Sequence, residues 1–105
     1  MDVSQRIKET VDSNRVMLFM KGNRDFPLCG FSGRAIQILQ TLGAEFETAD
    51  VLMDDEIRQG IKEFSNWPTI PQLYINGEFV GGSDIMMEMY ENGELKKALS
   101  QTPAA

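Results

Sequence analysis

Residues 67–80 decide the fold, and they read WPTIPQLYINGEFV. The second half of residues 67–75 predicts a β-strand. Asn76 and Gly77 follow as the two-residue signal of a β-hairpin turn, and residues 78–80 form the returning strand. This stretch therefore predicts an antiparallel pair of strands, preceded by a segment that contains two prolines.

A strand–helix–strand unit lies upstream of the hairpin. Residues 16–20, VMLFM, are a short apolar run bounded by Lys21-Gly22-Asn23 and predict a fully buried strand. Residues 32–42 carry apolar side chains at helical spacing, with Gly43 as the stop signal, and residues 46–51 predict a second strand. Such a unit crosses over right-handed and leaves its two strands parallel.

Further helices complete the pattern. We expect them at residues 4–14, after a cap at Asp54 or Asp55, at residues 85–91 after a cap at Ser83 or Asp84, and at residues 94–100. The helix after Asp54 or Asp55 would place Ile57, Ile61 and Phe64 on its inner face. The order predicts one α/β domain over residues 1–105, with a four-stranded mixed sheet and helices on both of its faces.

The composition restricts the possible functions. The chain has 105 residues, a net charge of −6, one cysteine and no histidine. The negative charge argues against nucleic-acid binding, which needs a basic surface. The longest apolar run, residues 16–20, is too short to span a membrane, and the first residues lack the features of a signal peptide. Without histidine there is neither a catalytic Cys-His pair nor a Cys/His zinc site.

Cys29 is the residue most suited to chemistry. It lies between a loop and a predicted helix start, where unpaired N–H groups and the helix dipole favour a thiolate. Lys21 and Arg24 are close in sequence and add positive charge. The alternative is that Cys29 is a small buried apolar residue. A lone cysteine also indicates a reducing compartment, the cytosol or an equivalent organelle interior.

The spacing Cys29-Gly30-Phe31-Ser32 lacks the second thiol of a Cys-x-x-Cys oxidoreductase. An external thiol must therefore resolve any mixed disulfide on Cys29. One chain also cannot supply the four thiolates of an iron–sulfur cluster. A symmetric dimer supplies two, and two small-molecule thiols complete the set.

The chain resembles the monothiol glutaredoxins of the single-domain Cys-Gly-Phe-Ser class, from Ser4 to about Ala98. The resemblance rests on five motifs in order: Met20-Lys21-Gly22, Cys29-Gly30-Phe31-Ser32, Asp55-Glu56-Ile57-Arg58, Trp67-Pro68-Thr69-Ile70-Pro71-Gln72-Leu73 and Gly81-Gly82-Ser83-Asp84-Ile85. It implies a thioredoxin-like fold, a cis peptide bond before Pro71 and a glutathione groove beside Cys29.

The resemblance also implies a set of glutathione-binding residues. Lys21 and Arg58 would hold the glycine carboxylate, Ile70 would pair its backbone with the cysteinyl part, and Ser83 and Asp84 would bind the γ-glutamyl end. Phe31, Thr69 and Gly82 complete the implied site. The alternatives are solvated surface cations for Lys21 and Arg58 and a plain helix cap for Ser83 and Asp84. Trp67 either shapes the groove wall or packs against Pro68.

Ser83 stands where many family members carry a second cysteine, so regulation through a disulfide to Cys29 is not available to this chain. The lengthened loop at residues 23–28 is kept, and in the family it accompanies cluster handling and weak reductase activity.

The resemblance implies a labile [2Fe–2S] cluster between two subunits, with one Cys29 ligand from each and glutathione for the rest. It implies a homodimer when loaded and a monomer as the apo form, with BolA-like proteins and apo iron–sulfur acceptors as partners. The expected role is cluster transfer and iron homeostasis, in the cytoplasm or in an organelle stroma or matrix. The competing reading is glutathione-dependent deglutathionylation of proteins through Cys29. Neither nucleic acid nor a membrane is an expected partner.

Overall fold

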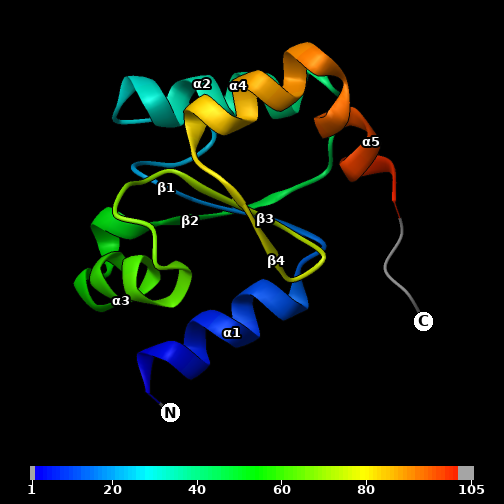
Figure 1. Cartoon of the computed structure of the whole chain (residues 1–105). Helices are drawn as coiled ribbons and strands as arrows, with labels where there is room; N and C mark the ends of the chain where they lie inside the picture. The colour runs from blue at the N-terminus through cyan, green and yellow to red at the C-terminus, as the bar shows by residue number, and fades with distance from the viewer. Residues whose placement is uncertain (1, 102–105) are drawn as a thin grey trace.

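Figure 1 shows the computed structural model of the chain, which describes residues 2–101. The expected domain over residues 1–105 includes residues 1 and 102–105, which lie outside the described residues. In chain order the elements are α1 (Val3–Ser13), β1 (Val16–Met20), α2 (Gly30–Thr41), β2 (Glu47–Asp50), the 3₁₀ helix η1 (Val51–Met53), α3 (Asp55–Ser65), β3 (Gln72–Ile75), β4 (Glu78–Gly81), α4 (Ser83–Asn92) and α5 (Glu94–Ser100).

The strands form one sheet in the order β2-β1-β3-β4. β1 pairs parallel with β2, as the crossover through α2 requires, and antiparallel with β3, which in turn pairs antiparallel with β4. The turn between β3 and β4 has positive φ at Asn76 (53°) and Gly77 (82°), the conformation that favours Asn-Gly in hairpins. The predicted four-stranded mixed sheet is confirmed.

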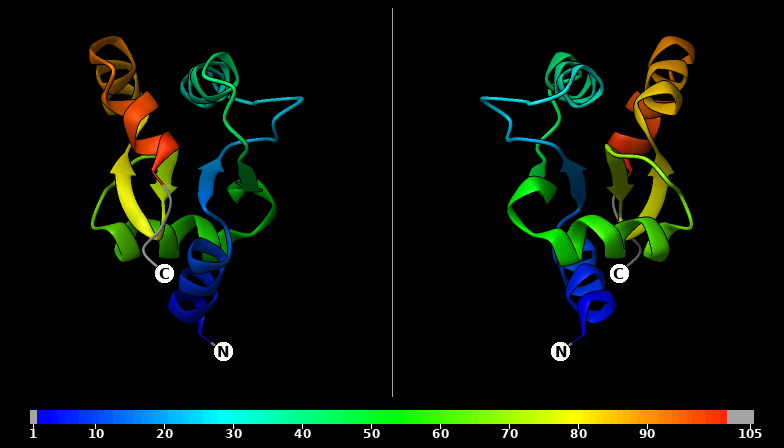
Figure 2. Two further views of the ribbon diagram at one scale, coloured as in Figure 1. Left: turned by 90° about the vertical axis from the view of Figure 1, so that its right-hand side faces the viewer. Right: turned by 90° about the vertical axis from the view of Figure 1, so that its left-hand side faces the viewer.

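β1 is buried along its whole length because helices cover both faces of the sheet. Val16, Leu18 and Met20 face a core shared with α2, α4 and α5, whereas Met17 and Phe19 face a second core shared with α1 and α3. Figure 2 shows the two layers, with α2 and α4 side by side on one face and α1 and α3 on the other. Side chains alternate across a strand, so a strand covered twice needs an uninterrupted apolar run.

Two predicted helix starts are wrong, and both lie where chemistry is expected. α2 begins at Gly30 rather than at Ser32, because Cys29 itself is the N-cap. α4 begins at Ser83, and its N-cap is Gly82, which has no side chain to cap with. The predicted capping role of Ser83 or Asp84 is therefore wrong. The cap of α3 is Asp54, one of the two expected residues.

Smaller differences concern the second strand and α3. β2 starts at Glu47 and ends at Asp50, because Val51 turns inward as the first residue of η1. Of the three residues expected on the inner face of α3, Ile61 is fully buried and Ile57 partly buried. Phe64 is exposed at its edge, with its ring 6.1 Å from that of Tyr74.

Gln72, at the start of β3, holds the preceding segment in place. Its buried amide nitrogen donates to the carbonyl oxygens of Trp67 and Thr69, both at 3.1 Å, and its Oε1 accepts from the hydroxyl of Tyr74 at 3.1 Å. The Ile70–Pro71 peptide bond is cis, as the resemblance implied. Because the nitrogen and the oxygen of this buried amide are both hydrogen-bonded, Gln72 fixes the backbone conformation of residues 67–71 before the strand.

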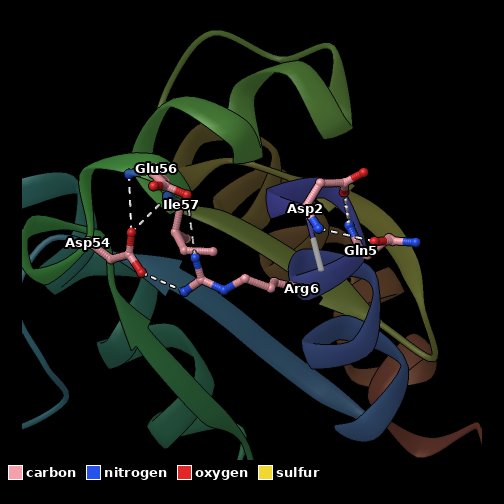
Figure 3. Close-up of polar contacts among 6 residues, drawn as sticks. All are labelled: Asp2, Gln5, Arg6, Asp54, Glu56 and Ile57. Atoms are coloured by element: carbon pink, nitrogen blue, oxygen red, sulfur yellow. Dashed lines mark hydrogen bonds and ion pairs between the residues drawn. The ribbon is translucent and has the colours of Figure 1, made fainter.

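An ion pair joins α1 to the first turn of α3 (Figure 3). Arg6 donates to Oδ2 of Asp54 at 2.7 Å, and its other terminal nitrogen lies 3.7 Å from the Glu56 carboxylate. Asp54 also accepts from the backbone N–H groups of Glu56 at 3.1 Å and Ile57 at 3.2 Å. The Arg6 hydrogen bond, followed by that from Ile57, holds the pKa of Asp54 below its ordinary value of 3.8.

Asp54→Ala is expected to reduce the loss of stability in acid. Because the folded-state pKa of Asp54 is lowered, its carboxylate stabilises the folded protein above the unfolded-state pKa, and this contribution disappears as the pH falls through the folded-state pKa. The wild type should therefore lose more of its free energy of unfolding than the variant between about pH 5 and pH 2. Urea unfolding across this range tests it, and an equal loss in both proteins contradicts it.

Candidate functional site

Cys29 ends the loop that leaves β1 and caps α2 with its sulfur. Its Sγ accepts the backbone N–H of Ser32 at 3.3 Å, and the Oγ of Ser32 lies 3.3 Å from the same sulfur. Ser32 is fully buried, and its Oγ also accepts the backbone N–H of Lys21 at 3.1 Å. In the thiol form Cys29 donates to this oxygen, and in the thiolate form the hydroxyl proton of Ser32 can turn toward the sulfur.

Burial of the thiol by itself raises the pKa of Cys29, but several hydrogen bonds and one charge outweigh it. The hydroxyl of Ser32, the backbone N–H groups of Ser32 and Phe31 and the charge of Lys21 all favour the thiolate. The pKa of Cys29 therefore lies below its ordinary value of 9.0, in the direction expected for a cysteine at a helix start.

Ser32→Ala is expected to raise the pKa of Cys29, because it removes the largest of the interactions that lower it. Since the thiolate is the nucleophile, the pH midpoint of alkylation by iodoacetamide moves upward and the rate at pH 7 falls several-fold. The rate measured from pH 5 to pH 10 tests this prediction. An unchanged midpoint would mean that the hydroxyl does not act on the sulfur.

A groove of about 370 Å³ lies next to this cysteine, within the size range of small-molecule sites. Among the residues expected in the site, the groove is lined by Lys21, Phe31, Thr69, Ile70, Gly82, Ser83 and Asp84. Cys29 is not itself part of the lining. It adjoins the groove through Phe31, and through Lys21, whose backbone shares the Ser32 hydroxyl with the sulfur.

The basic end of the groove differs from the expectation. The groove is lined by Lys62 of α3, whereas Arg58 is not among the lining residues. Lys62 lies four residues after Arg58, so both project from the same side of the helix. That spacing was the available signal for Lys62, which the sequence analysis missed. Pro68, Pro71 and Ile85 also line the groove and were not among the predicted site residues.

Trp67 lines the groove and also packs against an aromatic side chain. Its ring lies 6.0 Å from that of Phe79 on β4. A Cβ added at Gly82 would lie 3.2 Å from the carbonyl oxygen of Pro71 and 3.4 Å from Nε1 of Trp67. The glycine thus lets the start of α4 approach the Trp67–Pro71 segment closely, which narrows the groove between them.

The start of α4 forms the other end of the groove. Ser83 is only 6% exposed, and its Oγ has no hydrogen-bond partner within residues 2–101. No side chain caps the helix, so its first N–H groups remain open to an anion. Asp84, next to it, is 90% exposed, and its Oδ1 lies 3.7 Å from Nη1 of Arg34 on α2. This end combines donors for a carboxylate with an acceptor for an ammonium group.

Arg24 does not support Cys29. Its guanidinium donates to the carbonyl oxygen of Phe46 and lies 4.5 Å from the centre of the Phe46 ring. It therefore anchors the loop before Cys29 to the segment preceding β2. Closeness in sequence was a poor guide here because the loop turns away from the helix start.

The loop itself is held by its backbone. Asn23 and Phe26 exchange two N–H···O bonds of 3.2 Å, and Leu28 N–H donates to the carbonyl oxygen of Lys21 at 2.9 Å. Gly22 N–H donates to Oδ1 of Asp50 at 3.0 Å. Phe26 and Leu28, which precede Cys29 in the chain, and Phe31, which follows it, all have exposed side chains.

Within residues 2–101 no three His, Cys, Asp or Glu side chains come together as a metal site. In the same part of the chain, no helix has both the length and the apolar character that crossing a membrane demands.

The fold and the site define a class: a thioredoxin-like protein with one activated thiol beside a groove with charged ends. The sequence matches the glutaredoxin family over residues 16–80. It is 63% identical over 98 residues to an uncharacterized monothiol glutaredoxin, ycf64-like, of Synechocystis sp., a match that covers 93% of this chain and 92% of that one. The chain belongs to the glutaredoxin family, and it is a monothiol glutaredoxin.

Two solved structures agree with this placement. The solution structure of reduced poplar apo GrxS14 has a TM-score of 0.81 at 50% identity and covers 94% of both chains. The crystal structure of a buckwheat glutaredoxin–glutathione complex has a TM-score of 0.83 at 27% identity, over 93% of this chain and 87% of that one.

Proposed function

We propose that this chain carries a labile [2Fe–2S] cluster between two subunits, in cluster transfer and iron homeostasis. Each subunit contributes the Cys29 thiolate, and two glutathione thiolates complete the ligands. The observation that carries the proposal is the setting of Cys29: hydrogen bonds from Ser32 lower the pKa of its thiol, the chain has no second thiol to resolve a disulfide, and a groove with charged ends lies beside it. Thiolates suit this cluster type, and half of the set is exchangeable.

Glutathione fits the groove by charge. Its glycine carboxylate would meet Lys21 and Lys62, with Arg58 one helical turn away on α3. The cysteinyl part would lie along Thr69 and Ile70, adding backbone contacts as an extra strand does. The γ-glutamyl end would meet the open start of α4, where the buried Ser83 hydroxyl has no other partner in residues 2–101. That a related buckwheat glutaredoxin crystallised in complex with glutathione supports glutathione as the ligand.

The surface around Cys29 supports pairing of two subunits. Phe26, Leu28 and Phe31 are among the most exposed large apolar side chains of the described residues, and all three flank the cysteine. A second copy brought to the shared cluster would cover them. We propose a dimer when loaded and a monomer as the apo form, with BolA-like proteins and apo iron–sulfur proteins as partners, in the cytoplasm or an organelle stroma or matrix.

The lowered pKa of Cys29 also favours a second activity, deglutathionylation. Cys29 would attack the glutathionyl sulfur of a protein mixed disulfide, forming Cys29–S–S–glutathione and releasing the protein thiolate. A second glutathione thiolate would then attack the glutathionyl sulfur, freeing Cys29 and forming glutathione disulfide. The chain itself supplies no thiol for that second step, so glutathione must.

Anaerobic reconstitution with iron, sulfide and a cysteine desulfurase, with and without glutathione, tests the proposal. We expect a brown protein that elutes as a dimer only when glutathione is present. A colourless monomer in both preparations would overturn cluster carriage and leave deglutathionylation as the activity to assay.

A further inference from the structure

An ion pair joins Asp84, which lines the groove, to Arg34, which is not among the lining residues. Nη1 of Arg34, on the second turn of α2, lies 3.7 Å from Oδ1 of Asp84 at the start of α4. The Arg34 side chain is 44% exposed and that of Asp84 90% exposed. Ion pairs this exposed contribute little to folding stability. The two side chains can therefore bind a charged ligand at little cost to the free energy of unfolding.

The γ-glutamyl end of glutathione carries an ammonium and a carboxylate on the same carbon. Asp84 alone at this end attracts the ammonium but repels the carboxylate beside it. The helix start and the Ser83 hydroxyl supply donors for that carboxylate, yet no full positive charge. Arg34 supplies one, and its guanidinium suits a carboxylate geometrically.

We propose that Arg34 is a specificity-determining residue that binds the α-carboxylate of the γ-glutamyl group, while Asp84 binds its ammonium. This inference rests on the proposed glutathione site. The two side chains form a matched pair of opposite charges, poised on α2 and α4 for a zwitterion. The pair selects thiols with a free α-amino acid end over thiols that lack one.

The test measures the equilibrium between reduced Cys29 and a symmetrical disulfide, in which Cys29 gains one half of the disulfide and the other half leaves as a thiol. Three disulfides serve as probes: those of glutathione, of 4-aminobutanoyl-cysteinylglycine, which lacks the α-carboxylate, and of glutaryl-cysteinylglycine, which lacks the ammonium. Intact-mass spectrometry at fixed thiol-to-disulfide ratios gives each equilibrium constant.

Arg34→Gln is compared with Lys96→Gln, which removes the same charge from an exposed position on α5. Arg34→Gln should lower the constants for the glutathione and glutaryl probes about fivefold and leave that for the aminobutanoyl probe unchanged. Lys96→Gln should change none of them. Any general effect on the Cys29 thiolate alters all three constants together and cancels in their ratio. Thermal unfolding of both variants checks that they fold.

Unchanged constants for glutathione in Arg34→Gln would overturn the inference, as would an equal fall with all three probes. A rise for glutathione would also overturn it, since Arg34 would then compete for Asp84. A wild type that forms glutathione and aminobutanoyl adducts equally well would count against the proposed γ-glutamyl site itself. That result is distinct, because it appears in the wild type before any variant is compared.

Discussion

Cys29→Ser is expected to give a folded protein that forms no mixed disulfide with glutathione and retains no cluster. Cys29 is the chain's only cysteine, so no other thiol can replace it. The fold should survive because the sulfur acts as the N-cap of α2, accepting the N–H of Ser32, and serine is a preferred residue at that position. A serine hydroxyl is not ionised at neutral pH and serves neither as the nucleophile nor as the soft ligand.

Intact-mass spectrometry after incubation with glutathione disulfide measures the adduct, and visible absorption after reconstitution measures the cluster. Ser32→Ala is the matched control, because it should raise the pKa of Cys29 but keeps the thiol. This variant should still form the adduct. Cluster retention by Cys29→Ser would show that the iron is held elsewhere and would contradict the assignment of Cys29 as its ligand.

Gly22→Ala is expected to destabilise the fold strongly and to displace the loop before Cys29. Gly22 has φ +87°, and an added Cβ would lie 2.3 Å from the carbonyl oxygen of Phe26 and 2.7 Å from the nitrogen of Leu28. Both are backbone atoms of a loop closed by its own hydrogen bonds, so neither can yield without opening it. Strain at positive φ and the clash together should cost about 3 kcal/mol.

Gly43→Ala separates the two costs. Gly43 follows α2 with φ +69°, but an added Cβ there would meet no atom within 4 Å. That variant should lose only about 1 kcal/mol, the cost of the backbone conformation. Urea unfolding of both variants measures the difference, and alkylation of Cys29 reports the loop. Equal losses of stability in the two variants would mean that the loop tolerates the added methyl group.

Much of the fold was predictable because its local signals agree with its packing. The apolar run of β1 matches a strand covered on both faces, and Asn76-Gly77 matches a hairpin turn with two positive φ angles. Gly43 was predicted as the stop signal after the second helix, and it adopts the left-handed conformation directly after Leu42, the C-cap of α2. In these places neighbouring residues alone determine the conformation.

The larger errors lie next to Cys29 and at the start of α4, where tertiary packing overrides local preference. Capping statistics favour Ser83 or Asp84, but Ser83 is turned inward and leaves the cap to Gly82, whose missing side chain allows close approach to Pro71. Cys29 caps α2 although cysteine is not a preferred cap. The place of Lys62 in the groove lining depends on the position of α3, and the pairing of Arg34 with Asp84 depends on the position of α2 relative to α4. A short stretch of sequence does not reveal these positions.

In the proposed function, two Cys29 thiolates and two glutathione molecules hold one cluster between two chains. Native mass spectrometry of the protein reconstituted with glutathione is the decisive experiment, because it counts every component of one complex. We expect a species of two chains, one [2Fe–2S] cluster and two glutathione molecules, which dissociates to apo monomers when the cluster is lost. A cluster-bound dimer without glutathione, or a cluster on a single chain, would contradict the account.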